Sequence, residues 1–350
     1  MPEAQVAQRG RALIAFQAST AKAVTRLRAR AERELATQGL TADTLPDDMN
    51  ERHRAIDAAL TDSKTFKVHH LLGEWRAKMH GPVCTDAFEE VRAELEPKMA
   101  AADVGPTTLE FDPDIKLPDY YSKVWFHRTA GGWDASEHNG YIHGELIHKL
   151  LLTEIFGGDI FEQRRAAAEA LPRRDYQRIL DVGASSGHFT LALAETFPAA
   201  EITGIDFSPS MLQHARRTAN ERGLAWKLFV RAGEDTKFSD GTFDAVVSYN
   251  LLHEVPPRII KALMAEAFRV LAPGGDMLMA DVPRYGDIDK LASWRYDIVA
   301  RFGGEPHWRA SATADLAAMA REAGFVDVQA RGLGLGPNGH PYVVGGRKPA

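Results

Sequence analysis

The stretch RILDVGASSGH, residues 178–188, carries the most specific pattern in the chain. Its apolar first half, which ends at Asp181, predicts a buried strand, and Gly183 and Gly187 predict a loop. Apolar residues then recur at helical spacing over residues 189–197. A strand that passes through a glycine loop into a helix presents backbone N–H groups at the helix N-terminus, where a ligand can approach closely. The stretch therefore predicts a site for a nucleotide-like cofactor.

A second short strand is predicted at residues 201–206, EITGID, and it ends in an acidic residue. Asp206, about twenty residues after the loop, is placed to accept hydrogen bonds from ribose hydroxyls. The first loop lacks the G-x-G-x-x-G spacing of a dinucleotide site, and the Asp181 carboxylate would repel a pyrophosphate. Two acidic residues instead suit a ligand with a cationic amino group and one ribose. S-adenosylmethionine fits that description, whereas a dehydrogenase cofactor does not.

Further segments in the same order make residues 178–348 resemble the class I S-adenosylmethionine-dependent methyltransferases. GTFDAVVS at 241–248 is similar to the fourth strand of that family, and LAPGG at 271–275 is similar to the turn before its fifth strand. AGF at 323–325 is similar to the entry to its sixth strand. The resemblance covers about half of the chain, and it implies methyltransferase activity with S-adenosylmethionine as cofactor.

Strands and helices alternate regularly in this half, which predicts an α/β fold with a seven-stranded, doubly wound, Rossmann-like sheet. Strands are expected near 178–182, 201–206, 226–231, 243–248, 275–281, 325–331 and 341–347, and helices at 188–197, 209–222, 257–271 and 312–323. Ligands bind beyond the carboxyl ends of such strands. Asp181, Asp206, Glu234 and Asn250 all follow strand ends, so we expect them at the site.

Residues 1–116 predict an all-α N-terminal domain. A long amphipathic helix is expected from about Gln8 to Gln38, with an arginine-rich polar side that we interpret as a solvated face rather than a membrane or acidic-partner surface. A helical pattern continues from Asp57 to Pro106, and Gly81-Pro82 is expected to divide it into two helices. In the methyltransferases that the chain resembles, extra N-terminal helices build a dimer interface or roof the substrate pocket, and both alternatives stay open.

The amino-acid composition limits the classes of protein to which the chain can belong. The 350 residues are 45% hydrophobic and 26% charged, which allows a large core and two or three domains. Apolar runs stay well below the roughly 18 residues of a membrane span, and the N-terminus lacks the apolar core of a secretory signal. The one cysteine, Cys84, excludes an intrachain disulfide and a thiolate metal cluster, and we expect a cytoplasmic protein. A net charge of −6 disfavours a nucleic-acid partner.

Residues 117–170 predict a connector that is unusually rich in aromatic and histidine residues. Within it, WFHRTAGGWD at 125–134 looks like the segment before the first strand in the ubiquinone-biosynthesis type of methyltransferase, where it lies over the cofactor. We expect Tyr120, Tyr121 or Trp133 to cover the sulfonium by apolar and cation–π contact. The alternative is that these aromatic side chains are core between two domains.

Three connector histidines, His138, His143 and His148, are spaced five residues apart. On an α-helix each step of five residues turns by about 500°, so the three do not share a face. We therefore expect no metal site, and we expect histidines that line or support a polar pocket. A metal site drawn jointly from this helix and the cofactor domain stays open as the alternative.

The cofactor contacts expected from the pattern and the resemblance follow the loops in order. Asp181, Gly183, Ser185 and Gly187 would hold the methionine end, Asp206 the ribose with Phe207 beside it, and Gly233 with Glu234 or Asp235 the adenine, while Asn250, Tyr121 and Trp133 complete the site. The family often has an Asp where this chain has Ala232, so the adenine contact must fall on the residues that follow.

His253, in YNLLHEV at 249–255, is the first candidate for a general base, and His143 is the second. An imidazole pKa near ~6.5 lets the neutral ring take a proton from a phenol or hydroxyl. A histidine that only shapes the pocket is the alternative, because methyl transfer needs chiefly an in-line approach of the nucleophile.

Residues 282–310 form an insertion that family members use as an acceptor lid, and here it mixes aromatic and cationic side chains. That mixture fits a planar acceptor with an acidic group, and a structural helical hairpin is the alternative. The sequence thus predicts a methyltransferase that acts at an oxygen of a small aromatic or polycyclic acceptor. A homodimer is an open alternative, and no nucleic-acid or membrane partner is expected. Other chemistry of the bound sulfonium, or a non-catalytic scaffold, are the rival interpretations.

Overall fold

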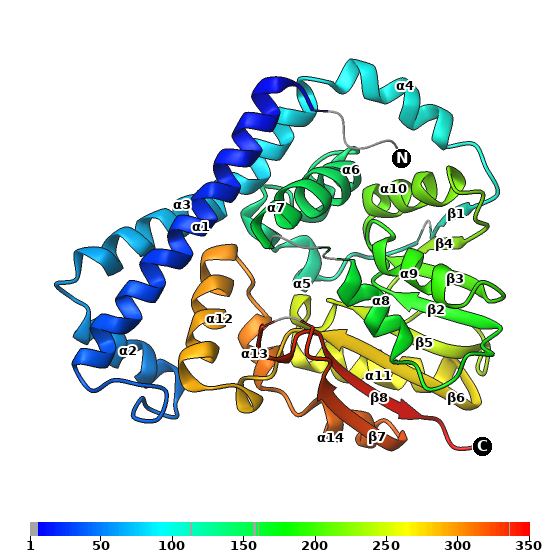
Figure 1. Ribbon diagram of the computed structural model, residues 1–350. Coiled ribbons are helices and arrows are strands. Elements are labelled where there is room, and N and C mark those ends of the chain that lie inside the picture. The colour runs from blue at the N-terminus through cyan, green and yellow to red at the C-terminus, as the bar shows by residue number, and fades with distance from the viewer. Residues whose placement is uncertain (1–5, 113, 157–158, 160, 336) are drawn as a thin grey trace.

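A mixed sheet lies at the centre of the molecule in the computed structural model, which describes residues 6–112, 114–156, 159, 161–335 and 337–350. Its eight strands have the order β1-β4-β3-β2-β5-β6-β8-β7 (Figure 1). The strands are β1 Thr108–Phe111, β2 Arg178–Val182, β3 Glu201–Asp206, β4 Lys227–Val230, β5 Phe243–Tyr249, β6 Leu271–Asp281, β7 Val326–Gly332 and β8 Tyr342–Arg347. Strand β8 runs antiparallel to both of its neighbours, β6 and β7, and the other pairs of described strands in this sheet are parallel. The fold is therefore the predicted Rossmann-like α/β class.

All seven strands expected from the sequence are present, and β2 and β3 have the predicted bounds. The count was one too low, because the N-terminal region that we expected to be all-α contributes β1. This strand pairs in parallel with the edge strand β4, from Thr108↔Lys227 to Phe111↔Val230. Most of its side chains are exposed, so it carries no apolar alternation that a sequence pattern could reveal. Its strand conformation comes from backbone pairing.

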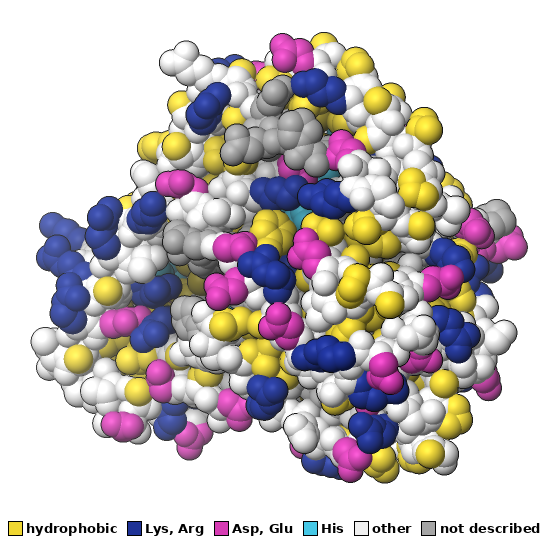
Figure 2. All heavy atoms as spheres, turned by 45° about the vertical axis from the view of Figure 1, so that its right-hand side comes forward, with side chains coloured by type: hydrophobic (Ala, Val, Ile, Leu, Met, Phe, Trp, Pro, Cys, Tyr) yellow, Lys and Arg dark blue, Asp and Glu magenta, His cyan; other side chains and the backbone are white. Residues whose placement is uncertain are grey.

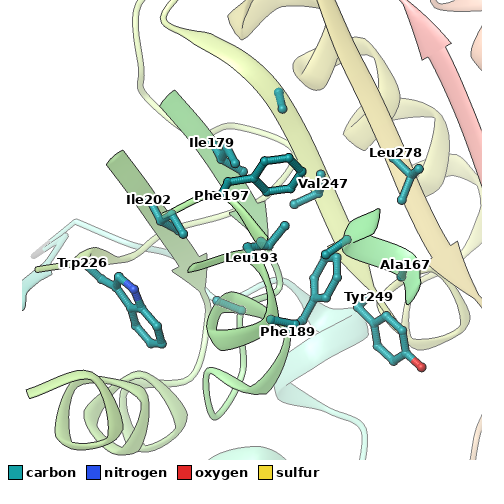
Figure 3. Packing of buried hydrophobic residues seen from close by; sticks show 14 of the residues in the cluster. Ala167, Ile179, Phe189, Leu193, Phe197, Ile202, Trp226, Val247, Tyr249 and Leu278 are labelled. Carbon is teal, nitrogen blue, oxygen red and sulfur yellow. The ribbon is translucent and has the colours of Figure 1, made fainter. Parts of the chain in front are cut away.

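Helices cover both faces of the sheet, as expected for a doubly wound fold. One face packs against α8 Glu162–Glu169, α9 His188–Thr196 and α10 Pro209–Asn220. Figure 3 shows this core, in which Phe189, Leu193 and Phe197 pack among β-strand residues such as Ile179 and Val247. The other face packs against α11 Pro257–Val270 and α14 Leu316–Glu322. The predicted helix at 312–323 is divided, since α13 ends at Thr313 and α14 begins at Leu316.

Four helices precede the sheet: α1 Gln8–Thr37, α2 Met49–Ala59, α3 Lys64–Glu89 and α4 Arg92–Ala102. The predicted break at Gly81-Pro82 was wrong, because α3 runs through both residues. Proline removes one helical hydrogen bond, yet both halves of α3 are held by apolar packing. Val83 and Phe88 pack with Ile14 of α1 in one cluster, and Phe66 packs with Leu35 in another.

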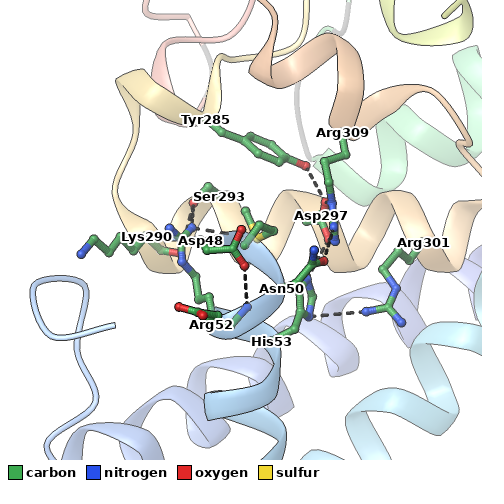
Figure 4. Close-up of polar contacts among 12 residues, drawn as sticks. Asp48, Asn50, Arg52, His53, Tyr285, Lys290, Ser293, Asp297, Arg301 and Arg309 are labelled. Carbon is green, nitrogen blue, oxygen red and sulfur yellow. Dashed lines mark hydrogen bonds and ion pairs between the residues drawn. The ribbon is translucent and has the colours of Figure 1, made fainter. Parts of the chain in front are cut away.

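The insertion at 282–310 forms α12 Lys290–Gly303 and the start of α13 Trp308–Thr313, and it packs against the N-terminal helices. Figure 4 shows polar contacts across this junction: Arg52 donates to the Ser293 hydroxyl at 2.5 Å, and His53 Nε2 lies 2.7 Å from Asp297 Oδ2. Arg309 also pairs with Asp297. The N-terminal helices and the predicted lid thus form one layer beside the sheet.

The connector consists of short pieces: α5 Asp119–Ser122, 3₁₀ turns Phe126–Arg128 and Gly132–Asp134, α6 Asn139–Tyr141, a π-helix Ile142–Leu152, and α7 Thr153–Phe156. Further 3₁₀ turns are Leu252–Glu254, Tyr285–Asp287 and Pro337–Gly339. Among the described helices, none combines the length and the apolarity that crossing a membrane requires.

A Gly140→Ala substitution is expected to lower the free energy of unfolding by about 1–3 kcal/mol through overpacking. The new Cβ would lie 2.1 Å from the Ser210 carbonyl oxygen, because α6 presses directly on α10 at this residue. Denaturant unfolding measures the effect, and Gly286→Ala is the control since a Cβ there meets nothing within 4 Å. Equal stability of the two variants would contradict the close packing of α6 on α10.

Candidate cofactor and acceptor site

A cavity of about 540 Å³ lies at the carboxyl ends of the central parallel strands. The loops after β2, β3, β4 and β5 form one side of it, and the connector and the inward sides of α1 and α3 form the other. Residues expected from the sequence that line this cavity are Gly183, Ser185, Asp206, Phe207, Gly233, Glu234, Asn250, His253, Tyr121, Trp133 and His143. Asp181, Gly187 and Asp235 are not among its lining residues.

The loop after β2 is shaped by left-handed backbone conformations at Gly183, Ser185 and Gly187, whose φ angles are 76°, 48° and 82°. Glycine adopts such angles without strain, which explains the spacing of the motif. The Gly183 N–H donates to the Ile205 carbonyl at 2.9 Å, which ties the loop to β3. Gly187 faces away from the cavity, and a Cβ there would meet the Ala215 side chain at 2.9 Å. Its role is therefore close packing of α9 and α10.

Asp206 lines the cavity at the end of β3 and is fixed by two backbone groups. Its Oδ2 accepts the Ser185 N–H and its Oδ1 accepts the Ser208 N–H, both at 2.9 Å. Burial raises the pKa of this carboxyl group to about 6, although the two N–H donors oppose the shift. Each carboxylate oxygen keeps a further lone pair, so the group can accept hydrogen bonds from a ligand's hydroxyls.

Asp181 lies beneath the loop and does not line the cavity. This corrects the expectation from the sequence that its side chain contacts the methionine end directly. Its side chain is fully buried, and Oδ2 accepts the Thr190 hydroxyl at 2.7 Å. Oδ1 has no hydrogen-bond partner among the described residues. Burial raises the pKa of Asp181 to about 7. The residue therefore supports the loop from below through α9.

An Asp181→Asn variant is expected to lose part of the pH dependence of stability. A carboxyl group with a raised native pKa binds protons more tightly in the folded state, so stability falls as pH rises from about 4 to about 7. The shift from 3.8 to about 7 corresponds to up to about 4 kcal/mol. Asparagine can still accept the Thr190 hydrogen bond. Urea unfolding at acidic and at mildly alkaline pH measures how the free energy of unfolding changes with pH in each protein. The same pH dependence in variant and wild type would contradict a buried carboxyl group with a raised pKa.

The two sequence candidates for the adenine contact are separated by the structure. Glu234 lines the cavity and accepts the Tyr120 hydroxyl at 2.5 Å, whereas Asp235 is exposed and pairs with Lys237. Asn250 also faces the cavity, and its buried Oδ1 has no hydrogen-bond partner within the described ranges. An unpartnered acceptor in a cavity wall is available to a ligand donor.

Two connector aromatics, Tyr121 and Trp133, lie in the wall opposite the strand ends. The Tyr121 hydroxyl donates to Asp134 Oδ2 at 2.7 Å, and Asp134 Oδ1 accepts the Ser208 hydroxyl at 2.6 Å. Because Ser208 caps α10 directly after Phe207, this chain of bonds fixes the connector onto the loop that follows β3. Trp133 stands edge-on to His143, with ring centroids 4.9 Å apart.

The expectation that residues five apart in the connector do not share a face was wrong for His143 and His148. Both lie in the π-helix, where backbone bonds join residues i and i+5, and their ring centroids are 4.3 Å apart. His138 lies elsewhere, with Nε2 3.2 Å from Glu96 Oε1, so the three histidine side chains do not form one cluster. Burial lowers the pKa of His143 and His148 well below the usual value, which keeps both rings neutral.

His253 lies in the cavity wall between two carboxylates. Its Nδ1 is 2.9 Å from Asp281 Oδ1, and its Nε2 is 3.4 Å from Glu254 Oε1. Burial alone would lower the pKa of His253, but these carboxylates outweigh it and hold the pKa well above the usual value. The surroundings therefore favour an imidazolium in the resting protein, not the neutral ring that the sequence analysis assumed.

Sequence reasoning missed His127 and Glu254 in the cavity wall, and Glu305, which contacts His127 but does not line the cavity. His127 Nδ1 lies 2.7 Å from Glu305 Oε1, and its Nε2 lies 3.6 Å from Glu254 Oε1. Burial opposes protonation of His127, yet the two carboxylates raise its pKa to about 9. These three residues come from segments far apart in the chain, so no local spacing could have revealed them.

The arginines of the insertion are engaged elsewhere. Arg284 donates to the carbonyls of Ser311 and Val282, Arg295 pairs with Glu32, and Arg309 pairs with Asp297. Among the residues of 282–310, only Val299 and Gly303 line the cavity. The expectation that cationic lid residues face the acceptor is therefore corrected. The cationic wall residues include Arg28 of α1 and Arg76 of α3.

Comparison with known proteins adds to this geometry. A sequence model described as a methyltransferase domain matches residues 179–275. The chain is 36% identical over 140 residues to a demethylmenaquinone methyltransferase of Thermus thermophilus, covering 40% of this chain and 60% of that protein. It is 30% identical over 186 residues to the enzyme of the same name from a Geobacillus species, covering 46% and 75%. An O-methyltransferase family structure from Burkholderia thailandensis aligns with a TM-score of 0.48 and 16% identity over 75% of this chain and 70% of that one.

The chain therefore belongs to the class I S-adenosylmethionine-dependent methyltransferases, and S-adenosylmethionine is the cofactor of its Rossmann-like domain. The chain spans less than two thirds of the length of the Thermus relative. The residues present fit this cofactor, since the wall offers a carboxylate with unused lone pairs at Asp206 and, at Asn250, an amide oxygen that no described residue bonds.

Proposed function

We propose that the chain transfers a methyl group from S-adenosylmethionine to a small aromatic or polycyclic acceptor, at an oxygen atom. The observation that carries this proposal is one cavity with cofactor-type loops on one side and aromatic and histidine side chains on the other. When bound, S-adenosylmethionine supplies an electrophilic methyl group. The acceptor must reach that group in line, so positioning by the cavity walls supplies much of the acceleration.

The cofactor would be held by the strand-end loops. We assign the ribose to Asp206, the adenine to Gly233 and Glu234 with Phe207 beside it, and the methionine end to the backbone of Gly183 and Ser185. Asn250 adds one acceptor. Asp181 would act through the loop it supports, since it does not line the cavity.

Tyr121, whose ring lies 5.1 Å from that of Phe207, and Trp133 would cover the sulfonium, and the acceptor would occupy the side bounded by Trp133 and His143. Aromatic walls favour a planar ring, and the demethylmenaquinone methyltransferases among the relatives are named for an aromatic substrate. A small molecule suits a cavity of about 540 Å³.

A nucleic acid would need a continuous basic face, whereas Figure 2 has acidic and basic side chains intermixed over the face in view.

His253, oriented by Asp281, is our candidate for the acid–base group. Once the acceptor is bound, the imidazole must release its proton before it can accept one from an acceptor hydroxyl. His143 is neutral from the start and is the second candidate on the same wall.

The N-terminal helices would serve as the roof of the acceptor pocket. Ala21, Thr25 and Arg28 of α1 and Arg76 and His80 of α3 line the cavity, which favours this role over one limited to dimerisation. A homodimer would bury apolar surface at the exposed side chains on other sides of α1 and α3, which are Phe16, Leu71 and Trp75.

A reducing, cytoplasmic location fits Cys84, whose buried thiol has a pKa raised to about 12.

The test is an incubation of the purified chain with carbon-13 methyl-labelled S-adenosylmethionine and a panel of phenols, naphthols and hydroquinones. Mass spectrometry should find a product heavier by one methylene, and the carbon-13 chemical shift should identify a methoxyl group. A methyl group on ring carbon would overturn the choice of oxygen. Cofactor binding without any methylated product across the panel would favour other sulfonium chemistry or a scaffold.

A further inference from the structure

A cluster of one histidine and two carboxylates lies beside the proposed acceptor position, and none of the three is assigned to the cofactor. His127 comes from the 3₁₀ turn Phe126–Arg128, Glu254 from the turn after β5, and Glu305 from the segment after α12. One ligand atom from each side chain lies within 4.8 Å of the other two. His127 and Glu254 line the cavity.

The carboxylates of this cluster are poorly satisfied by protein groups. The Glu305 side chain is only 7% exposed and that of Glu254 only 13%. Glu254 Oε2 and Glu305 Oε2 are both buried, and neither has a hydrogen-bond partner in the described part of the chain. Buried carboxylate oxygens are costly unless a donor or a cation faces them. The positive charges that face the two carboxylates come from His127 and from His253, whose Nε2 lies 3.4 Å from Glu254 Oε1.

The turn that carries His127 is held in a costly conformation. His127 and Arg128 have φ angles of 51° and 56°, in the left-handed region that costs a non-glycine residue about 1–3 kcal/mol. The Arg128 guanidinium donates to the carbonyls of Phe302 and Arg301, the latter at 3.0 Å. These bonds fix the turn against α12, close to Glu305, and they aim the imidazole at both carboxylates.

We propose that His127, Glu254 and Glu305 bind one divalent first-row transition cation at the acceptor end of the cavity. One nitrogen and two carboxylate oxygens suit Zn²⁺, Co²⁺, Mn²⁺ or Fe²⁺. Two ligands that are each ~2.1 Å from an ion in tetrahedral geometry lie about 3.4 Å apart. The 3.6 Å between His127 Nε2 and Glu254 Oε1 is close to that separation. Glu305 Oε1 lies 2.7 Å from Nδ1, the other ring nitrogen, so the cation would replace the proton on Nε2 and Glu305 would reach it through its buried Oε2.

Such a cation would face the cavity with its remaining coordination positions. There it would bind an acceptor oxygen as the anion and lower the pKa of the corresponding hydroxyl. This consequence rests on the proposed function and narrows the acceptor to molecules with a coordinating oxygen, such as a catechol or hydroxyquinone. Cation binding itself does not depend on methyl transfer.

The test is a titration of chelator-treated full-length protein with Co²⁺, followed by calorimetry and by the visible absorption of the bound ion. We expect one site per chain. Glu305→Gln and Glu254→Gln should each weaken Co²⁺ binding by at least about tenfold. His138→Gln is the matched control, because His138 also lies beside a carboxylate, Glu96, but outside the cavity.

Calorimetry with S-adenosylmethionine in the same samples separates the possible failures. Retained cofactor affinity shows that a variant is folded and tests the cofactor site without the cation. The absence of stoichiometric Co²⁺ binding by the wild-type chain, or equal affinity in wild type and both glutamine variants, would overturn the proposed site while leaving the methyltransferase proposal standing.

Discussion

A His253→Gln variant is expected to turn over about 10²–10⁴-fold more slowly than the wild type, with unchanged affinity for S-adenosylmethionine. A positioned acid–base group contributes acceleration of that size. His253 lies in the cavity wall and is held by Asp281 through a 2.9 Å contact at Nδ1, which leaves Nε2 toward Glu254. Turnover with a confirmed acceptor and calorimetry with the cofactor measure the two quantities separately.

The pH dependence of turnover tests the same assignment. Because Asp281 and Glu254 hold the pKa of His253 well above its usual value, kcat/KM should rise with pH until the imidazolium is deprotonated. An Asp281→Asn variant removes one carboxylate, so the midpoint of this rise should move to lower pH. His138→Gln serves as the control with an unchanged profile. Normal turnover in His253→Gln would show that the ring is only pocket wall.

An Asp206→Ala variant is expected to bind S-adenosylmethionine about 1–3 kcal/mol more weakly, because hydrogen bonds to a charged acceptor are lost. Such a loss is about 5–150-fold in affinity. Asp206 lines the cavity and its orientation is set by the Ser185 and Ser208 N–H groups. Glu201→Gln is a matched control, since Glu201 lies at the opposite end of the same strand, away from the cavity, and pairs there with Lys227.

The affinity of the wild type should also depend on pH. With the pKa of Asp206 raised to about 6, the carboxyl becomes protonated below that value and accepts hydrogen bonds less well. Cofactor binding should weaken as the pH falls below about 6, and the Asp206→Ala variant should lack this component. A pH-independent wild-type affinity, or Asp206→Ala binding as tightly as Glu201→Gln, would remove Asp206 from the site.

Local sequence patterns predicted most of the strands and helices of the fold. The strands β2 and β3 could be placed from apolar runs bounded by glycine and acidic residues, and the cofactor loops followed from their ends. Strand β1 could not, because its side chains are mostly exposed and its conformation depends on pairing with β4. The run of α3 through Pro82 likewise depends on tertiary packing against α1.

The candidate site divides in the same way. Gly183, Asp206 and His253 sit in local motifs, whereas Asp181 is in the motif but beneath the loop. The edge-to-face contact of His143 and His148 needs a π-helix, which five-residue spacing alone does not predict. His127 and Glu305 meet only because the connector turn packs against α12.

The most direct test of the account is calorimetric titration of the wild-type chain and the Asp206→Ala variant with S-adenosylmethionine. The account predicts one site per wild-type chain with micromolar affinity, and binding weakened by about 5–150-fold in the variant. No binding to the wild type would contradict the cofactor site on which the proposed methyl transfer depends.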